Sequence, residues 1–182
     1  YLDLPIQHAS DAILKKMGRR TSKAQLVDTI RTLREEIPDI TLRTTLITGF
    51  PGETEEQHQE LVEFVDEMEF DRLGVFTYSP EENTPAAEMP DQIPEPVKGV
   101  RSDRLIALGE ENRKRFEQSW IGRQAEVLFE EQTMIDGKPY FVGYTKEYIR
   151  VAIPADQDYA NRELSGILKP GPAEHVLLLQ LI

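Results

Sequence analysis

The stretch Ile40-Thr41-Leu42-Arg43-Thr44-Thr45-Leu46-Ile47-Thr48, followed by Gly49-Phe50-Pro51-Gly52-Glu53-Thr54, decides the fold. Its first part is rich in β-branched side chains, which predicts a buried strand over residues 40–48. The glycines and the proline then predict a turn, and Thr54 with Gln57 forms a capping box that begins a helix. A strand, a tight turn and a capped helix together indicate one βα unit of a parallel sheet.

Similar units flank this stretch. We predict two further strands, over 1–5 and 73–78, and three further helices, over 10–18, 22–37 and 97–119. The βαβαβα order of residues 1–119 predicts parallel strands with helices outside. A closed barrel of this kind needs about eight strands. We therefore interpret this region as part of a larger barrel, with a small open sheet as the alternative. The first residue is Tyr1 rather than Met, so we expect a piece of a longer protein.

The pattern changes near Trp120, which sets predicted domains at 1–119 and 120–182. Short strands dominate the second region, and Asp136-Gly137 is typical of a two-residue hairpin turn. We predict about five short strands that form a small antiparallel barrel. The strands that the pattern marks are 125–129, 140–144, 148–153 and 176–182.

Composition excludes several functions. The chain has 182 residues, no cysteine and a net charge of −12, so it offers no thiolate for zinc, iron–sulfur clusters or nucleophilic catalysis. No apolar stretch approaches the length of a membrane span. An acidic surface favours a basic or neutral partner over a phosphate backbone.

Hydrogen-bonding residues follow all three predicted strands of the first region. The ends of parallel strands meet at one edge of a sheet, where α/β proteins hold ligands. We therefore predict one mouth for a small polar ligand, with ordinary tight turns as the alternative reading of the glycines. The residues concerned are Gln7, Ser10, Gly49, Pro51, Gly52 and Tyr78.

Two charged or titratable residues have open interpretations. Arg43 lies within the buried strand, where a charge requires an anionic partner, either a structural carboxylate or one from a ligand. His8 is either an acid–base group or a structural residue beside a turn. His58 and His175 lie far from it in the sequence, so we do not expect a histidine metal site.

Three segments together resemble the radical S-adenosylmethionine methylthiotransferase family. They are Leu4-Pro5-Ile6-Gln7-His8-Ala9-Ser10, Ile47-Thr48-Gly49-Phe50-Pro51-Gly52-Glu53-Thr54, and Phe76-Thr77-Tyr78-Ser79-Pro80 with Thr84-Pro85-Ala86. More loosely, residues 120–182 resemble the small OB-like TRAM barrel of that family, through Gly122-Arg123 and Val142-Gly143-Tyr144-Thr145.

The resemblance implies that residues 1–119 are the C-terminal half of a radical SAM barrel and that the chain is a fragment. It implies S-adenosylmethionine and two 4Fe-4S clusters in the complete enzyme. The cluster cysteines are absent here, so we expect an inactive fragment with no catalytic residue, no metal ligand and no bound cofactor. At the matching positions the resemblance implies cofactor contacts from Gln7, Ser10, Arg43, Thr45 and Tyr78, in a turn shaped by Gly49, Pro51 and Gly52.

The family has two substrate branches, one modifying an aspartate of a small-subunit ribosomal protein and the other an adenosine of tRNA. Residues 120–182 carry 6 basic and 9 acidic side chains, which favours the basic ribosomal protein. The alternatives are the tRNA enzyme and a substrate-docking module without catalysis. The aromatic residues Phe129, Tyr140, Phe141, Tyr144 and Tyr148 could stack on bases or belong to the core. We expect a cytoplasmic protein, without a membrane contact, whose open sheet edge can pair with a second copy.

Overall fold

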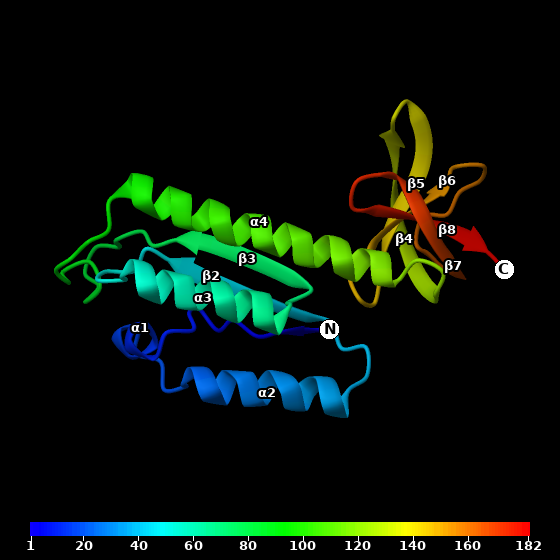
Figure 1. Cartoon of the computed structure of the whole chain (residues 1–182). Coiled ribbons are helices and arrows are strands. Elements are labelled where there is room, and N and C mark those ends of the chain that lie inside the picture. The colour runs from blue at the N-terminus through cyan, green and yellow to red at the C-terminus, as the bar shows by residue number, and fades with distance from the viewer. The chain divides into compact units, whose positions relative to one another are not determined.

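The computed structural model describes residues 1–182 and contains two separate sheets. The first has three parallel strands in the order β1-β2-β3 (Figure 1). They are β1 (Leu2–Asp3), β2 (Leu42–Thr48) and β3 (Arg72–Thr77). The predicted parallel sheet is therefore confirmed, although its first strand is shorter than the expected 1–5.

Four helices accompany these strands: α1 (Asp11–Lys16), α2 (Lys23–Glu36), α3 (Glu55–Met68) and α4 (Glu95–Ser119). In Figure 1, α2, α3 and α4 run lengthwise alongside the strands. None of the helices combines the length and the hydrophobicity that crossing a bilayer requires.

Capping boxes begin two of these helices. The Ser22 hydroxyl accepts the backbone N–H of Gln25, whose side chain accepts the backbone N–H of Ser22. Thr54 and Gln57 make the same reciprocal pair at the start of α3, as predicted. Each box satisfies N–H groups that the first helical turn leaves without partners. The order strand, turn and capped helix that the sequence predicts around Gly49 is therefore present.

Strand β2 alternates strictly between two environments. Leu42 and Leu46 are fully buried in the apolar core beneath the helices. Arg43, Thr45 and Ile47 point to the other face of the sheet and are half-buried. Because side chains alternate along a strand, the helices cover one face and leave the other without a helical layer.

The second sheet is a closed barrel in the order β4-β5-β6-β8-β7. All its pairs are antiparallel except β6 with β8. The small β barrel predicted for the C-terminal region is therefore confirmed. Its strands are β4 (Gln124–Ile135), β5 (Lys138–Thr145), β6 (Arg150–Pro154), β7 (Arg162–Ala173) and β8 (Val176–Leu181).

The hairpin turn between β4 and β5 matches its prediction. Asp136 and Gly137 have φ values of 48° and 74°, as a two-residue turn with both central residues left-handed requires. Strand β7, in contrast, lies where no strand was marked. Its segment Lys169-Pro170-Gly171-Pro172 weakens the strand pattern, and the pairing with β8 is irregular between Lys169 and Ala173.

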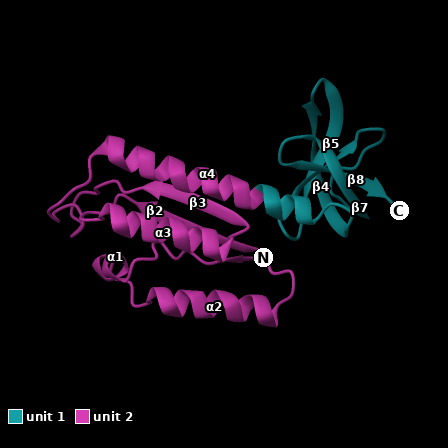
Figure 2. Cartoon of the chain, in the orientation of Figure 1, with its two compact units in different colours: residues 1, 114–182 teal, residues 2–113 magenta.

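The chain divides into two compact units, residues 2–113 and residue 1 with 114–182 (Figure 2). We call them the α/β unit and the barrel unit. They divide within α4, between Arg113 and Lys114. The domain division at residues 119 and 120 stays a prediction.

Candidate functional site

The segments that follow the three parallel strands meet at one edge of the sheet. The Gln7 N–H donates to the carbonyl of Thr45 (2.9 Å), and the Ile47 N–H donates to the carbonyl of Gln7 (2.8 Å). On the other side of β2, the Tyr78 N–H donates to the Thr48 carbonyl (2.9 Å). These backbone bonds bring residues far apart in the sequence into one row, which we call the strand-end edge.

The turn Gly49-Phe50-Pro51-Gly52 forms the centre of the strand-end edge. Gly49 and Gly52 have φ values of 75° and 73°, which L side chains rarely adopt. A Cβ at Gly49 would overlap the side chain of Lys98, and one at Gly52 would meet the ammonium of Lys16. The backbone therefore requires both glycines, and at Gly49 the buried stem of Lys98 leaves no room for a side chain.

Tyr78 lies beside this turn. Its ring packs edge-on against Phe50, with 5.2 Å between the ring centroids. The Lys98 ammonium lies 5.4 Å from the Tyr78 ring centroid and donates to the Tyr78 carbonyl (2.8 Å). The Tyr78 hydroxyl is buried and has no hydrogen-bond partner. A buried hydroxyl of this kind is available to a polar group of a ligand, since leaving it unpaired costs free energy.

Ser10 and Arg43 are placed differently from the other predicted residues. Ser10 is the N-cap residue of α1, but its side chain makes no capping hydrogen bond. Arg43 lies near the start of β2, away from the strand-end edge, and forms an ion pair with Asp3. Its side chain is 38% exposed, so Arg43 is less buried than the strand pattern indicates, and in the structure it pairs with a carboxylate of the chain itself, one of the two predicted alternatives.

A buried carboxylate that the sequence reasoning missed lies beneath the turn. Glu53 is 2% exposed, and its Oε2 accepts the backbone N–H of Gly49 (2.7 Å). Its Oε1 accepts the Thr48 hydroxyl (3.2 Å) and the Arg101 guanidinium (2.9 Å). Arg101 also donates to the Glu53 carbonyl (3.1 Å), which fixes the guanidinium at two points of one residue.

Two buried histidines complete this group, which we call the Glu53 cluster. His8 Nε2 lies 3.5 Å from Glu53 Oε2, and His58 Nδ1 lies 3.6 Å from Glu53 Oε1. The Ser10 N–H donates to His8 Nδ1 (3.0 Å), which places the His8 proton on Nε2, facing the carboxylate. His58 Nδ1 lies 3.3 Å from the Thr48 hydroxyl, and its Nε2 is buried without a partner.

Charges in the Glu53 cluster are set by its surroundings. Burial by itself would raise the pKa of Glu53, but His8, the Gly49 N–H and Arg101 together hold that pKa below its ordinary value. Burial lowers the pKa of His58, and the negative charge of Glu53 opposes this only in part. The cluster at neutral pH is therefore a carboxylate paired with Arg101 and a neutral His58.

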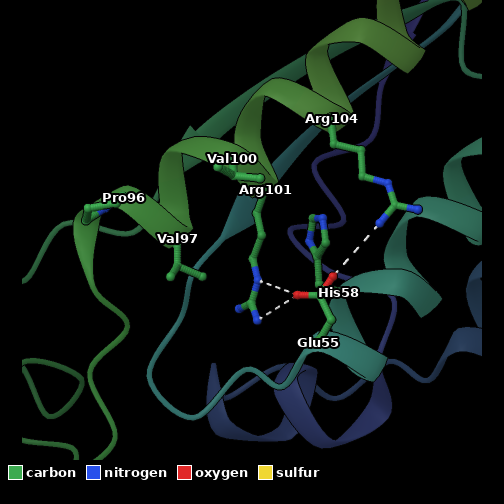
Figure 3. A pocket seen from close by; sticks show the side chains of 7 residues that line it. All are labelled: Glu55, His58, Pro96, Val97, Val100, Arg101 and Arg104. Carbon is green, nitrogen blue, oxygen red and sulfur yellow. Dashed lines mark hydrogen bonds and ion pairs between the residues drawn. The ribbon is translucent and has the colours of Figure 1, made fainter.

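A pocket of about 330 Å³ opens over His58, between α3 and α4 (Figure 3). Its charged side chains pair with one another, since Glu55 lies 3.2 Å from Arg101 and 3.9 Å from Arg104. The remaining lining is mostly apolar, and Val100 is 71% exposed. The residues that line it are Glu55, His58, Pro96, Val97, Val100, Arg101 and Arg104.

Sequence spacing contained little signal for the Glu53 cluster. Its members come from the segment after β1, the turn after β2, and helices α3 and α4. Glu53 itself reads as part of a helix start, and Arg101 as one charge on a helix rich in charges. The position of Glu53, directly after Gly52 of the turn, is the only sequence feature that could have marked Glu53 as a site residue. No group of three or more metal-ligating side chains has the arrangement of a metal site.

Comparison with known proteins agrees with this architecture. Residues 1–65 match the model of the radical SAM superfamily. The chain is 56% identical, over 80% of its length, to the ribosomal protein uS12 methylthiotransferase RimO of Lachnoclostridium phytofermentans, and covers 32% of that protein. It is 52% identical over 72% of its length to RimO of Desulfitobacterium hafniense, and covers 29% of it. RimO of Anaeromyxobacter sp. strain K is 41% identical over 95% of the chain, which covers 42% of that relative.

The parallel strands with their helices, and the match to the superfamily model, place this chain in the radical SAM superfamily. Within the superfamily, the chain belongs to the RimO-like family. The chain spans about a third of the length of the first two of these relatives. The resemblance seen in the sequence is therefore confirmed at the level of the family.

Proposed function

We propose that this chain is the part of a radical SAM methylthiotransferase that holds S-adenosylmethionine along the strand-end edge. The observation that carries the proposal is the edge itself, with a glycine turn, a buried unpaired Tyr78 hydroxyl and the flanking Gln7 in one row. The proposed cofactor contacts are Gln7, Ser10, Arg43, Thr45, Gly49, Pro51, Gly52 and Tyr78. Of these residues, Arg43 lies furthest from the strand-end edge.

When bound, S-adenosylmethionine supplies the methyl group and, with a reduced iron–sulfur cluster, the one-electron chemistry of this superfamily. The chain's own contribution is to bind and orient. The Tyr78 hydroxyl can hydrogen-bond to a polar group of the cofactor, and the ring pair of Phe50 and Tyr78 offers an apolar surface beside it. The chain has no cysteine, so these residues do not fit a cluster, and we expect the chain alone to be inactive.

We further propose a small-subunit ribosomal protein as the substrate, because the named relatives are uS12 methylthiotransferases. The barrel unit offers a surface for a basic partner. One hollow has three carboxylates against one ammonium, and the neighbouring hollow shares Glu130 and adds further carboxylates. The charged and aromatic residues that line the first are Glu126, Glu130, Glu163, Lys146, Tyr144 and Tyr148. Acidic groups around exposed aromatic rings suit a lysine- and arginine-rich segment. A ribosomal substrate also implies a cytoplasmic protein.

Transfer RNA is the second candidate partner. The predicted aromatic set splits in two. Phe129 and Phe141 belong to the barrel core and Tyr140 packs, partly buried, on a second apolar cluster, whereas Tyr144 and Tyr148 are 39% and 51% exposed. The two exposed rings lie 6.1 Å apart and could stack on unpaired bases. The carboxylates that surround them oppose a phosphate backbone. We therefore favour the protein partner, while dimerisation through the open sheet edge stays a prediction.

Binding of labelled uS12 and of labelled tRNA to the chain, followed by fluorescence anisotropy over a salt series, tests the choice of substrate. We expect uS12 to bind, with an affinity that falls as salt rises. Replacing Glu126, Glu130 and Glu163 with glutamine should weaken uS12 binding about tenfold or more. The matched control Asp28→Asn/Glu35→Gln/Glu36→Gln changes the net charge equally on the α/β unit and should bind as the wild type does. Tight, salt-sensitive binding of tRNA instead of uS12 would overturn the proposal.

A further inference from the structure

The N–H of Gly49 points into the protein rather than toward the mouth of the strand-end edge. It donates to Glu53 Oε2 at 2.7 Å, one of the shortest hydrogen bonds in the α/β unit. Gly49 has a φ of 75°, and a glycine has many other conformations open to it. A charge-assisted hydrogen bond of this length selects one of them. The backbone of the turn is therefore fixed from beneath, by a side chain four residues later.

Glu53 is itself held by three other segments. Arg101 of α4 binds both its carboxylate and its carbonyl (2.9 and 3.1 Å). His8, the residue after Gln7, faces Oε2 at 3.5 Å, and His58 of α3 faces Oε1 at 3.6 Å. A buried carboxylate is costly unless it is paired and hydrogen-bonded. Glu53 meets both conditions through Arg101, the Thr48 hydroxyl and the Gly49 N–H, while the two histidines lie against it without a hydrogen bond to it.

Helix α4 reaches the strand-end edge at a second point. Lys98 and Arg101 are three residues apart, so they lie on the same side of the helix. Lys98 donates to the Tyr78 carbonyl (2.8 Å) and packs over Gly49, while Arg101 pairs with Glu53. One helix face therefore holds both Tyr78 and the glycine turn.

From this geometry we infer that Glu53 is a positioning residue for S-adenosylmethionine: by binding the Gly49 N–H and the Arg101 guanidinium together, it fixes the turn 49–52 in the conformation that receives the cofactor. This inference rests on the proposed function of the strand-end edge. Glu53 is 2% exposed and its carboxylate is taken up by Gly49, Thr48 and Arg101, so we propose that it acts through Gly49 without touching the cofactor.

The first test needs no cofactor. In wild-type protein, NMR should detect a scalar coupling across the hydrogen bond between the Gly49 nitrogen and the Glu53 carboxyl carbon. Glu53→Gln should increase amide hydrogen exchange at Gly49 about tenfold or more, because it removes the charge from a strong hydrogen bond. The control Glu55→Gln removes a neighbouring carboxylate that also pairs with Arg101 but does not reach Gly49. Exchange at Gly49 should be unchanged in this control.

Glu53→Asp is the second variant, for the case in which Glu53→Gln does not fold. It keeps the charge beside Arg101 but withdraws the carboxylate by one methylene, so we expect the same loss of protection at Gly49. A folded variant of either kind with wild-type protection at Gly49, or the absence of the coupling in the wild type, would overturn the inference.

The second test adds S-adenosylmethionine at millimolar concentrations and follows the amide signals of residues 49–52. We expect shifts in the wild type and in Glu55→Gln, and an affinity about tenfold weaker in the Glu53 variants. Equal affinities in wild type and Glu53 variants would contradict the inference alone. No shift in any protein would instead contradict cofactor binding by the strand-end edge, while the exchange result would still decide whether Glu53 holds the turn.

Discussion

The α/β unit and the barrel unit each bury an apolar core, and they differ in the cluster of charged side chains that only the α/β unit buries at its strand-end edge. Beneath the strand-end edge of the α/β unit lie charged and titratable side chains that are almost inaccessible, among them Glu53, Lys98 and Arg101. The centre of the barrel is apolar, with Val127, Phe129 and other aliphatic and aromatic side chains in contact. Buried charges contribute little net stability compared with apolar packing of similar volume. We conclude that the apolar interior of the barrel stabilises its fold, whereas the Glu53 cluster fixes the conformation of the strand-end edge.

The largest effect should come from the apolar centre of the barrel. Phe129→Ala removes a fully buried ring and should lower the free energy of unfolding of this unit by about 3–5 kcal/mol. Chemical denaturation followed by the fluorescence of Trp120, the single tryptophan, reports on the barrel. Leu128→Ala, at a side chain that is 48% exposed, should change the same free energy by about 0.5 kcal/mol or less. Similar losses of unfolding free energy in the two variants would contradict the conclusion that the apolar interior stabilises the barrel.

A slightly smaller effect should follow from breaking the ion pair of the Glu53 cluster. Arg101→Met leaves the Glu53 carboxylate buried without its cation and should destabilise the α/β unit by about 3 kcal/mol. Arg104→Met, at a half-exposed arginine of the same pocket, should cost at most about 1 kcal/mol. Hydrogen exchange of the core amides of α3 measures both. An equal cost for the two arginines would mean that Glu53 does not depend on Arg101.

The two units should also differ in their response to acid. The pKa of His58 is lowered in the folded state, so the unfolded chain takes up a proton first as the pH falls below about 6.5. Glu53 has a lowered pKa as well, so its contribution is present above about pH 4.5 and is lost as the pH falls through its folded pKa. These two groups should therefore make the α/β unit lose stability from pH 7 downward, by at most about 1.4 kcal/mol per pH unit for each proton. Burial raises the pKa of Asp71, which acts in the opposite direction as the pH falls through its folded pKa.

His58→Gln should remove the part of this loss that begins near neutrality, and His175→Gln in the barrel unit should not. Thermal unfolding of the α/β unit over pH 5–8 measures the difference. An unchanged pH profile in His58→Gln would mean that this histidine is not held neutral by burial.

The smallest effects compare two glycines. Gly137→Ala should destabilise the barrel by about 1 kcal/mol, because φ at this position is 74° and disfavours a side chain. Gly99→Ala within α4 should stabilise the α/β unit by about 0.5–1 kcal/mol, because the helix is regular there and a Cβ meets nothing within 4 Å. Equilibrium unfolding of each unit gives both signs, and equal signs would contradict the backbone argument.

Features fixed by neighbouring residues could be predicted from the sequence. The capping box at Thr54 and the turn at Asp136-Gly137 depend on residues a few positions apart, and both are present. Strand β7 could not be marked, because Pro170 and Pro172 lower its strand propensity while pairing with β4 and β8 holds it in the barrel. The Glu53 cluster was missed for a related reason. His8, Glu53 and Arg101 are brought together only by the tertiary fold, and a buried ion pair leaves no periodic pattern in the sequence.

The measurement that tests the central claim most directly is an NMR titration of the whole chain with S-adenosylmethionine, with backbone amides assigned in both units. Because the chain lacks the cluster cysteines, we expect only weak binding, at millimolar S-adenosylmethionine. Such binding along the strand-end edge predicts that Gln7, Gly49 and Tyr78 shift together, with one dissociation constant, while the amides of β4–β8 stay in place. Shifts confined to the barrel unit, or scattered over both units without this common constant, would contradict it.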